Sequence, residues 1–422
     1  MNSLLVVADD FTGALDTGVQ FSRKGVPALV LTKEQALFER SGMSDVDVLV
    51  VDIESRHIPP GEAYKIVRDI TADAAAHGVR YFYKKTDSAL RGNVGAELAG
   101  MLDASEETCL TFVPAFPKSN RVTRDGIQYI DGVEVANSVF SKDPFEPVRY
   151  SAVSDVISLQ TDIPTENIPK WAYERAALKP DKRTLRILDA ESMEDIERLG
   201  AQLKLGGNLR LLAGCAGFAE ILPDLLDLSE REMAWRKNTD NILIVSGSVN
   251  PITIDQLLYG DELGISAFTL SPLQKLDAGY IESHDCETFV RDIAEILGKR
   301  GQAIIRTVGK LDEVAVTESL ARKSGIPESE ISRRVAENIG AITLRILNSA
   351  HVGNLVVFGG DTLHSILSKM RCEGVLPVFE ISPGLVAARI LSPDHDCVVI
   401  TKSGGLGGHD VLGSIEAFVW RE

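Results

Sequence analysis

The sequence predicts an α/β protein with two α/β domains, whose largely parallel sheets face one another across a cleft. In both halves of the chain, short apolar runs alternate with segments of helical periodicity. A chain of 422 residues is too long for a single compact core, since domains average roughly 150 residues, and this length predicts more than one domain. The polar stretch 229–240 has no strand character. We therefore expect one domain at 1–228, a linker at 229–240 and a second domain at 241–422.

The first domain is expected to begin with strands connected by helices. The strands are predicted at residues 4–8, 28–32, 46–53, 81–85 and 108–114. The helices between them are predicted at 13–24, 61–76 and 94–102. Turn sequences such as Arg124-Asp125-Gly126 predict a hairpin insertion over 121–139. Strand character then returns at 186–189 and 210–213, and a helical run follows each of these strands.

The second domain repeats the alternation. Strands are predicted at 242–245, 267–270, 303–308, 355–358, 375–379 and 398–401. Helices are predicted at 253–259, 288–299, 329–347 and 410–419. Helical crossovers between apolar strands indicate parallel pairing in both domains.

Composition excludes several classes of function. The net charge of -17 argues against a nucleic-acid binder, which needs a basic face. The five cysteines lack metal-ligand spacing and the seven histidines are dispersed, so a catalytic zinc is not expected. No apolar run is long enough to span a membrane and no signal peptide is recognised, which predicts a cytoplasmic protein. A homo-oligomer is compatible with the sequence.

Two adjacent carboxylates, Asp9 and Asp10, follow the apolar run 4–7. They are expected at the carboxyl end of a buried strand, the edge where open α/β sheets bind ligands. Asp10 or Thr12 could simply cap the next helix. We expect one carboxylate to cap and the other to act, so Asp9 and Asp10 are the candidate catalytic residues.

A second polar cluster follows the predicted strand 81–85 and suits a small polyhydroxy acid. Arg91 or Lys85 would pair with the carboxylate of such an acid, while Asp87 and Ser88 would bind its hydroxyls. The alternative is an exposed turn with salt bridges of little energetic weight. Arg121 is expected in a wall or lid. The candidate substrate-binding residues are Asp9, Arg56, Lys85, Thr86, Asp87, Ser88 and Arg91.

Three glycine- and hydroxyl-rich loops each follow an apolar strand of the second domain. Glycines let backbone N–H groups surround an anion, although simple turn chemistry is the alternative for any one loop. No Walker A motif or dinucleotide fingerprint occurs, so we expect a nucleoside triphosphate in a different loop geometry, with Lys402 as a point charge. The candidate residues are Ser246, Ser248, Gly359, Gly360, Asp361, Thr362, Lys402, Ser403, Gly404 and Gly405.

Together these stretches resemble the four-carbon acid sugar kinase family over essentially the whole chain. The resemblance rests on residues 8–14, 85–93, 114–117 with Arg121, 143–161, 246–248, 359–362 and 402–405. It implies that residues 1–228 form a sugar-acid (substrate) binding domain, in which Asp9, Arg56 and residues 85–88 bind substrate. It also implies that residues 241–422 form a nucleotide-binding domain, in which Ser246 or Ser248, residues 359–362 and Gly404 bind ATP.

The activity implied by the resemblance is transfer of the ATP γ-phosphoryl group to the terminal (4-) hydroxyl of a four-carbon sugar acid. D-threonate or D-erythronate is expected as the substrate, with 3-oxotetronate as the alternative. Arg56 and Arg91 would hold the carboxylate, and Asp9, or else Asp10, would orient or deprotonate the hydroxyl. Mg²⁺ is inferred from the chemistry, without assigned ligands. A non-catalytic sugar-acid sensor and a sugar-acid dehydrogenase are the rival functions.

Overall fold

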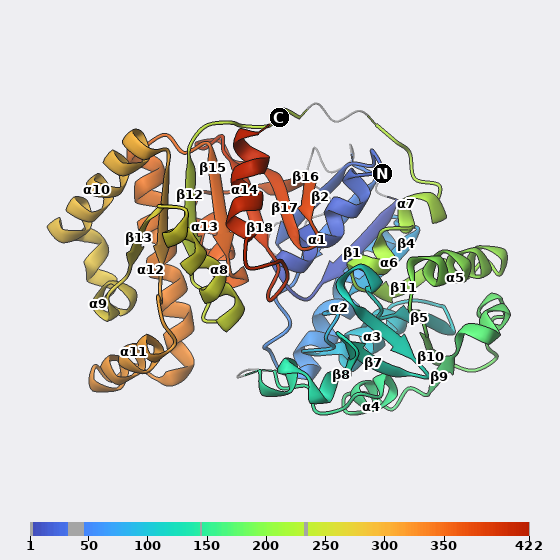
Figure 1. Cartoon of the computed structure of the whole chain (residues 1–422). Helices are drawn as coiled ribbons and strands as arrows, with labels where there is room; N and C mark the ends of the chain where they lie inside the picture. The colour runs from blue at the N-terminus through green and yellow to red at the C-terminus, as the bar shows by residue number, and fades with distance from the viewer. Residues whose placement is uncertain (1–2, 33–45, 144–145, 232–234, 422) are drawn as a thin grey trace. The chain divides into compact units, whose positions relative to one another are not determined.

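The computed structural model describes residues 3–32, 46–143, 146–231 and 235–421 (Figure 1). The chain forms two compact units, Met1–Met233 and Ala234–Glu422, each of which is an α/β structure. The α/β class is therefore confirmed. Residues 232–234 of the expected linker lie outside the described residues, and the roles assigned to the two domains remain predictions.

Unit 1 is built on a parallel sheet with the strand order β2-β3-β1-β4-β11-β5-β10-β9. Its strands are β1 Leu4–Ala8, β2 Ala28–Thr32, β3 Val48–Asp52, β4 Tyr81–Lys85, β5 Cys109–Val113, β9 Thr165–Ile168, β10 Thr184–Leu188 and β11 Leu211–Gly214. β1, β2 and β3 are apolar and almost entirely buried, as expected for parallel strands covered on both faces. β1 is central and pairs with both β3 and β4.

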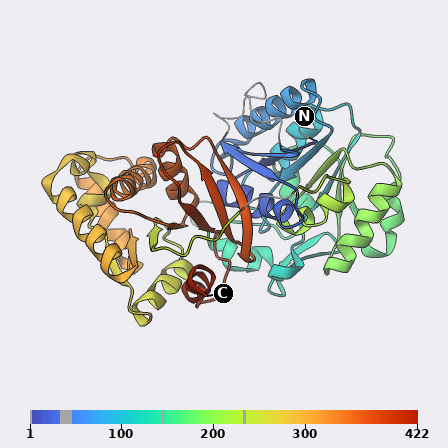
Figure 2. The same ribbon diagram turned by 90° about the horizontal axis from the view of Figure 1, so that it is seen from above.

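Helices cover both faces of this sheet. They are α1 Phe11–Ser22, α2 Pro60–Ala76, α3 Val94–Asp103, α4 Val153–Ser158, α5 Met193–Leu205, α6 Ala216–Ala219 and α7 Leu222–Leu225. Short 3-10 helices lie at Pro117–Ser119, Val135–Asn137, Val139–Lys142 and Lys170–Ala177. α1 packs with α6 and α2 packs with α3, and these two pairs lie on opposite faces of the sheet (Figure 2).

The hairpin insertion predicted over 121–139 is confirmed as a small antiparallel sheet. Its strands are β6 Arg121–Arg124, β7 Ile127–Ile130 and β8 Val133–Glu134. Asp125 and Gly126 form the first turn with φ of 50° and 75°, and Asp131 and Gly132 form the second with φ of 50° and 78°. Short polar residues and glycine tolerate this left-handed region, which explains why the turn residues were informative.

Unit 2 has the strand order β13-β14-β12-β15-β18-β17-β16. Its strands are β12 Ile242–Ser246, β13 Ser266–Thr269, β14 Gln302–Arg306, β15 Asn354–Phe358, β16 Gly374–Ser382, β17 Leu385–Leu391 and β18 Val398–Lys402. Its helices are α8 Pro251–Glu262, α9 Pro272–Leu276, α10 His284–Arg300, α11 Asp312–Lys323, α12 Glu328–Ser349, α13 Gly360–Lys369 and α14 Val411–Trp420, with a 3-10 helix at Ala278–Glu282. No helix in the described ranges has the length and apolar character that crossing a bilayer requires.

The sheet of unit 2 departs from the expected parallel pattern at one edge. The strand predicted at 375–379 is β16, and it turns back at Gly384 (φ 77°) into β17, which pairs antiparallel with both β16 and β18. A two-residue turn permits this hairpin, whereas parallel neighbours need a longer crossover. The sequence analysis did not predict β17, β9, α11 or α13. The start of α13 was interpreted only as part of a glycine loop.

The packing of α2 against α3 generates a stability prediction. A Cβ at Gly100 on α3 would lie 2.5 Å from the backbone oxygen of Tyr64 on α2, whereas a Cβ at Gly61 on α2 would meet nothing within 4 Å. We expect Gly100→Ala to lower the free energy of unfolding by about 1–3 kcal/mol, because the helices must separate.

The matched control is Gly61→Ala, which should leave stability unchanged or raise it by about 0.5 kcal/mol. Urea unfolding followed by circular dichroism measures both variants. Equal midpoints for the two variants would contradict the close approach at Gly100.

Candidate active site

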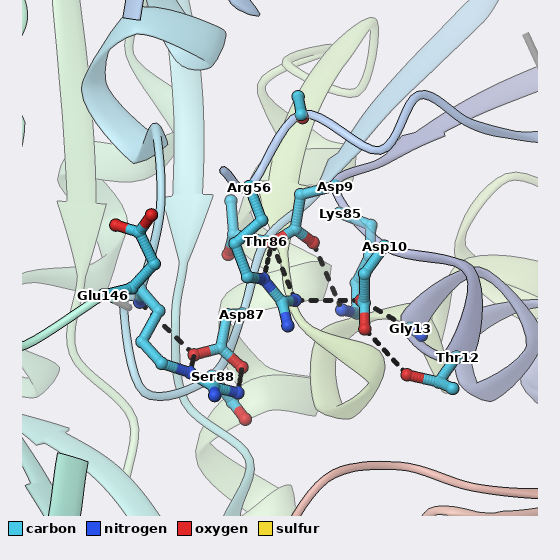
Figure 3. A network of polar contacts seen from close by, with 12 residues as sticks. Asp9, Asp10, Thr12, Gly13, Arg56, Lys85, Thr86, Asp87, Ser88 and Glu146 are labelled. Atoms are coloured by element: carbon cyan, nitrogen blue, oxygen red, sulfur yellow. Dashed lines mark hydrogen bonds and ion pairs between the residues drawn. The ribbon is translucent and has the colours of Figure 1, made fainter. Parts of the chain in front are cut away.

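The two carboxylates that follow β1 have different surroundings (Figure 3). Asp10 is the N-cap of α1: its Oδ1 accepts from the amide of Gly13 at 3.2 Å and its Oδ2 accepts from the hydroxyl of Thr12 at 2.7 Å. One of the pair therefore caps the helix, as expected. Asp9 is 2% exposed and has no capping role, which leaves it as the carboxylate for a ligand.

Arg56 joins both carboxylates. Its Nε and Nη2 lie 2.9 and 2.8 Å from Asp9 Oδ2, and Nη2 also lies 2.9 Å from Asp10 Oδ1. Burial raises the pKa of Asp10, but the charges of Arg56 and Lys85 outweigh burial and hold this pKa below its ordinary value. Asp9 Oδ1 is buried and has no hydrogen-bond partner among the described residues. Such an oxygen is costly to bury unless a ligand supplies a donor.

The loop that carries Arg56 is fixed by the neighbouring loop 86–93. The Asn93 side chain donates to the carbonyls of Ser55 and Ile58 at 2.7 and 2.8 Å. Gly92 has a φ of 83°, and a Cβ there would lie 3.0 Å from Arg56 Cγ. The two loops can approach this closely because residue 92 is glycine.

The adjacent lysines of β4 have separate roles, because successive strand residues face opposite sides of a sheet. The Nζ of Lys84 is buried, lies 3.0 Å from Glu97 Oε2, and donates to the carbonyls of Val7 and Lys85 at 3.1 and 2.6 Å. The Nζ of Lys85 lies 4.0 Å from Asp9 Oδ1 and makes no hydrogen bond to the residues that the structure describes. Lys84 is thus structural, and Lys85 retains donors for a ligand.

Arg91 is held by protein carboxylates. Its Nε and Nη2 donate to the two oxygens of Asp87 at 2.8 and 3.1 Å, and its Nη1 donates to Asp143 at 3.1 Å. Burial raises the pKa of Asp87, but the charges of Arg91, Arg56 and Arg121 together outweigh burial and hold this pKa well below its ordinary value. The sequence predicts Arg91 or Lys85 as the partner of a substrate carboxylate. The structure instead engages Arg91 with Asp87 and Asp143.

Arg121 takes a more central place than the wall or lid expected from the sequence. It is 7% exposed, its Nη1 donates to the hydroxyl of Ser88, and its guanidinium lies 5.3 Å from the ring centre of Phe140. Burial lowers the pKa of Arg121. No carboxylate in the described ranges forms an ion pair with it. Arg121 is therefore the arginine of this cluster best able to receive an anionic ligand.

The polar network of Figure 3 collects the predicted substrate residues at the ends of β1, β3 and β4. Strand register explains this, since Ala8 pairs with both Asp52 of β3 and Lys85 of β4. Thr86 is present too, but its hydroxyl lies 3.4 Å from the Gly214 carbonyl, a weak contact with the neighbouring strand. The sequence analysis did not single out Phe140, and it assigned no role to Asp143. Asp143 begins the 143–161 region and Phe140 lies just before it. That position was the sequence signal available for these two residues.

The three glycine loops leave adjacent parallel strands of unit 2 at the same level. Ser246 of β12 pairs with Phe358 of β15, and Phe358 pairs with Lys402 of β18. The first two loops are in contact, because a Cβ at Gly247 would lie only 2.0 Å from Thr362 Oγ1. The structure therefore brings these predicted nucleotide-binding loops together within unit 2.

The serine hydroxyls of the first loop shape the start of α8. Ser246 Oγ accepts from the amide of Ser248 at 3.3 Å, and Ser248 Oγ accepts from the amide of Asn250 at 3.2 Å. Asn250 in turn caps α8. Both hydroxyls keep their own protons for donation, next to a helix N-terminus that favours anions.

Lys402 does not extend toward a ligand as a free charge. It is 2% exposed, and its Nζ donates to the carbonyls of Gly404 and, at 3.2 Å, Leu406. The sequence predicts a phosphate contact for Lys402, whereas the structure turns its ammonium toward the carbonyls of its own loop.

Asp361 has the chemistry to share a metal ion with a bound nucleotide. Its exposed carboxylate lies in the first turn of α13, beside Gly360, and forms no ion pair within the described ranges. Mg²⁺ binds through one or two carboxylates together with phosphate oxygens and water, so a single carboxylate beside the glycine loops fits it.

Two protein-family models match separate segments of the chain, and each segment contains one of the two sets of loops. Residues 4–222 match a model described as a sugar-binding N-terminal domain. Residues 243–412 match a model described as a nucleotide-binding C-terminal domain.

Curated relatives align over nearly the full length. The chain is 27% identical to a D-threonate kinase of Salmonella typhimurium, covering 97% of this chain and 96% of the relative. It is 28% identical to a D-erythronate kinase of Heliobacterium modesticaldum, covering 97% and 95%. It is 24% identical to a 3-oxo-tetronate kinase of Methylobacterium radiotolerans, covering 96% and 97%.

Solved structures share the fold. A crystal structure of a Salmonella typhimurium protein superposes with a TM-score of 0.78 at 19% identity, covering 98% of each chain. A Haemophilus influenzae protein superposes with a TM-score of 0.72 at 20% identity, covering 98% of this chain and all of that one. At such identities these structures support the fold only.

The buried Lys84–Glu97 pair generates a second stability prediction. We expect Lys84→Met to lower the free energy of unfolding by about 3–5 kcal/mol, because it leaves the carboxylate of Glu97 buried without its cation. The double variant Lys84→Met/Glu97→Leu should recover most of that loss, since no unpaired charge remains.

Urea unfolding of wild type, Lys84→Met, Glu97→Leu and the double variant measures these free energies. If the double variant loses the sum of the two single losses in unfolding free energy, the pair is not coupled as described.

Proposed function

Because the chain belongs to the four-carbon acid sugar kinase family, we propose that it transfers the γ-phosphoryl group of ATP to the terminal hydroxyl of a four-carbon sugar acid, D-threonate or D-erythronate. The substrate domain is unit 1 and the nucleotide domain is unit 2 in this proposal. The observation that carries the catalytic assignment is the geometry of Asp9. One of its oxygens is fixed by Arg56, and the other is buried without a donor.

Asp9 is the proposed base in this reaction. A substrate hydroxyl would donate to Asp9 Oδ1, and its proton would pass to this oxygen as the hydroxyl oxygen bonds to the γ-phosphorus and the bond to the β-phosphate oxygen breaks. ADP is the leaving group. Asp10 is the weaker candidate, because capping Gly13 and pairing with Arg56 and Thr12 engage both of its oxygens.

The remaining cations of unit 1 would orient the sugar acid. Arg121 and Lys85 have donors left for a carboxylate, whereas Arg91 and Arg56 already pair with aspartates. Arg56 would act mainly by holding Asp9, in addition to any substrate contact. Fixing the carboxylate determines which hydroxyl reaches Asp9, and such positioning supplies much of the rate of phosphoryl transfer.

The loops of unit 2 would bind the phosphates of ATP through backbone N–H groups and the hydroxyls of Ser246, Ser248 and Thr362. Gly359, with φ of 114°, lets the second loop pass close to the first. Mg²⁺, held by Asp361 and the phosphates, would offset negative charge on the transferred group.

A panel of acids measured by ADP release tests the reaction. We expect turnover with ATP, Mg²⁺ and D-threonate or D-erythronate, and little with D-glycerate. Turnover only with a 3-oxotetronate would assign the alternative substrate. ATP binding without turnover on any of these acids would contradict the proposed substrate and keep nucleotide binding. Binding of a sugar acid with neither ATP binding nor turnover would support a sugar-acid sensor and contradict the kinase proposal.

Replacing Asp9 tests its assignment. Asp9→Asn should lower kcat about 10²- to 10⁴-fold, because the amide cannot take the proton, while the KM for ATP stays the same. Asp195, a buried aspartate on α5, provides the matched control, and Asp195→Asn should keep kcat. A kcat within a few-fold of wild type for Asp9→Asn would refute the role of Asp9.

A further inference from the structure

Two buried side chains donate hydrogen bonds to the carbonyl groups of the glycine loop after β18. Lys402 Nζ donates to the carbonyls of Gly404 and Leu406. The side-chain amide of Gln256, on α8, donates to the carbonyls of Leu406, Gly407 and Gly408 at 3.3, 3.0 and 2.9 Å. Gln256 is fully buried, so neither side chain reaches the loop from solvent.

The amide groups of the same loop are mostly unused. Leu406 N–H donates to the Ser403 carbonyl at 3.1 Å. Within the described ranges, the N–H groups of Gly404, Gly405, Gly407 and Gly408 donate to no protein acceptor. Gly404 and Gly407 have positive φ values of 43° and 88°, the left-handed backbone region that also occurs in anion-binding turns of the main chain.

We propose that Lys402 and Gln256 are positioning residues, which hold the loop carbonyls in the protein so that the glycine N–H groups remain as donors for the phosphates of a nucleotide. This inference rests on the nucleotide-binding half of the proposed function. A carbonyl oxygen directed at a phosphate would repel it, because both carry negative charge. Phosphate binding therefore requires that the carbonyls point into the protein as well as that the amides point toward the ligand. Both residues act through the loop and neither contacts the nucleotide in this scheme.

The surroundings of Lys402 agree with this role. Its ammonium lies 5.7 Å from the ring centre of Phe358, and no acidic side chain forms an ion pair with it in the described ranges. Burial lowers the pKa of Lys402 to about 8. Lys84 pairs with the carboxylate of Glu97, whereas the acceptors of Lys402 are carbonyls of the glycine loop.

The test measures ligand binding by the full-length protein by calorimetry, without sugar acid. The probes are ATP, inorganic tripolyphosphate and adenosine. We expect Lys402→Met and Gln256→Met each to weaken ATP and tripolyphosphate binding about 10- to 100-fold, with adenosine binding unchanged. Lys402→Arg should recover part of the affinity, because it restores donors to the carbonyls.

Asn354→Leu is the matched control. Asn354 is a buried amide of unit 2 at the start of β15, and its side chain donates to the carbonyls of Asn238, Asp240 and Asn241 at 3.3, 3.4 and 3.4 Å, at the opposite end of the strand from the glycine loops. We expect this variant to bind ATP as wild type does. If Lys402→Met does not fold, Gln256→Met tests the same loop from α8, through the shared carbonyl of Leu406 and those of Gly407 and Gly408.

The outcomes separate the two proposals. Wild-type affinity for ATP in both Lys402→Met and Gln256→Met would overturn the positioning role while leaving the kinase proposal intact. Equal losses of ATP and adenosine binding would also overturn it, because they would indicate general damage to unit 2. A wild-type protein that binds neither ATP nor tripolyphosphate would contradict the proposed function itself.

Discussion

The pairing of Arg56 with Asp9 and Asp10 is the interaction on which the arrangement of unit 1 depends. Two adjacent carboxylates at a buried strand end repel one another, and one guanidinium contacting both offsets that repulsion. The pairing also makes the carboxylates unequal. Asp10 is used by the helix cap, whereas Asp9 keeps one oxygen for a ligand. Asn93 and Gly92 act in support, because they hold the loop that delivers Arg56.

Both units use buried side chains to orient the candidate ligand-binding groups. In unit 1, Asp87 holds Arg91 and Ser88 accepts from Arg121, so the cations at the site have fixed directions. In unit 2, Lys402 and Gln256 hold backbone carbonyls, which leaves glycine amides unpaired. Preorganised donors of this kind need little rearrangement when charge develops on a phosphoryl group.

Much of the fold, and the grouping of the candidate site residues, could be predicted from the sequence, because apolar strands followed by polar turns mark the carboxyl edge of a parallel sheet. The directions of side chains could not. Gln160 accepts from the amides of Gly95 and Ala96 at the start of α3, 64 and more residues away, and Arg121 meets Ser88 across 33 residues. Such contacts depend on tertiary packing and leave no local pattern. The direction of the Lys402 ammonium could not be predicted for the same reason: its sequence neighbours indicate a phosphate loop, but not which way the ammonium points.

A double-mutant cycle on kcat/KM for the accepted sugar acid tests the central claim, that Asp9 and Arg56 act as one unit. The proteins are wild type, Asp9→Asn, Arg56→Met and the double variant, all assayed by ADP release. The account predicts that the double variant loses about as much activity as the more impaired single variant. Removing either residue already removes the correctly held carboxylate that accepts the proton. Losses that multiply would mean that the two residues contribute independently, and would contradict the account.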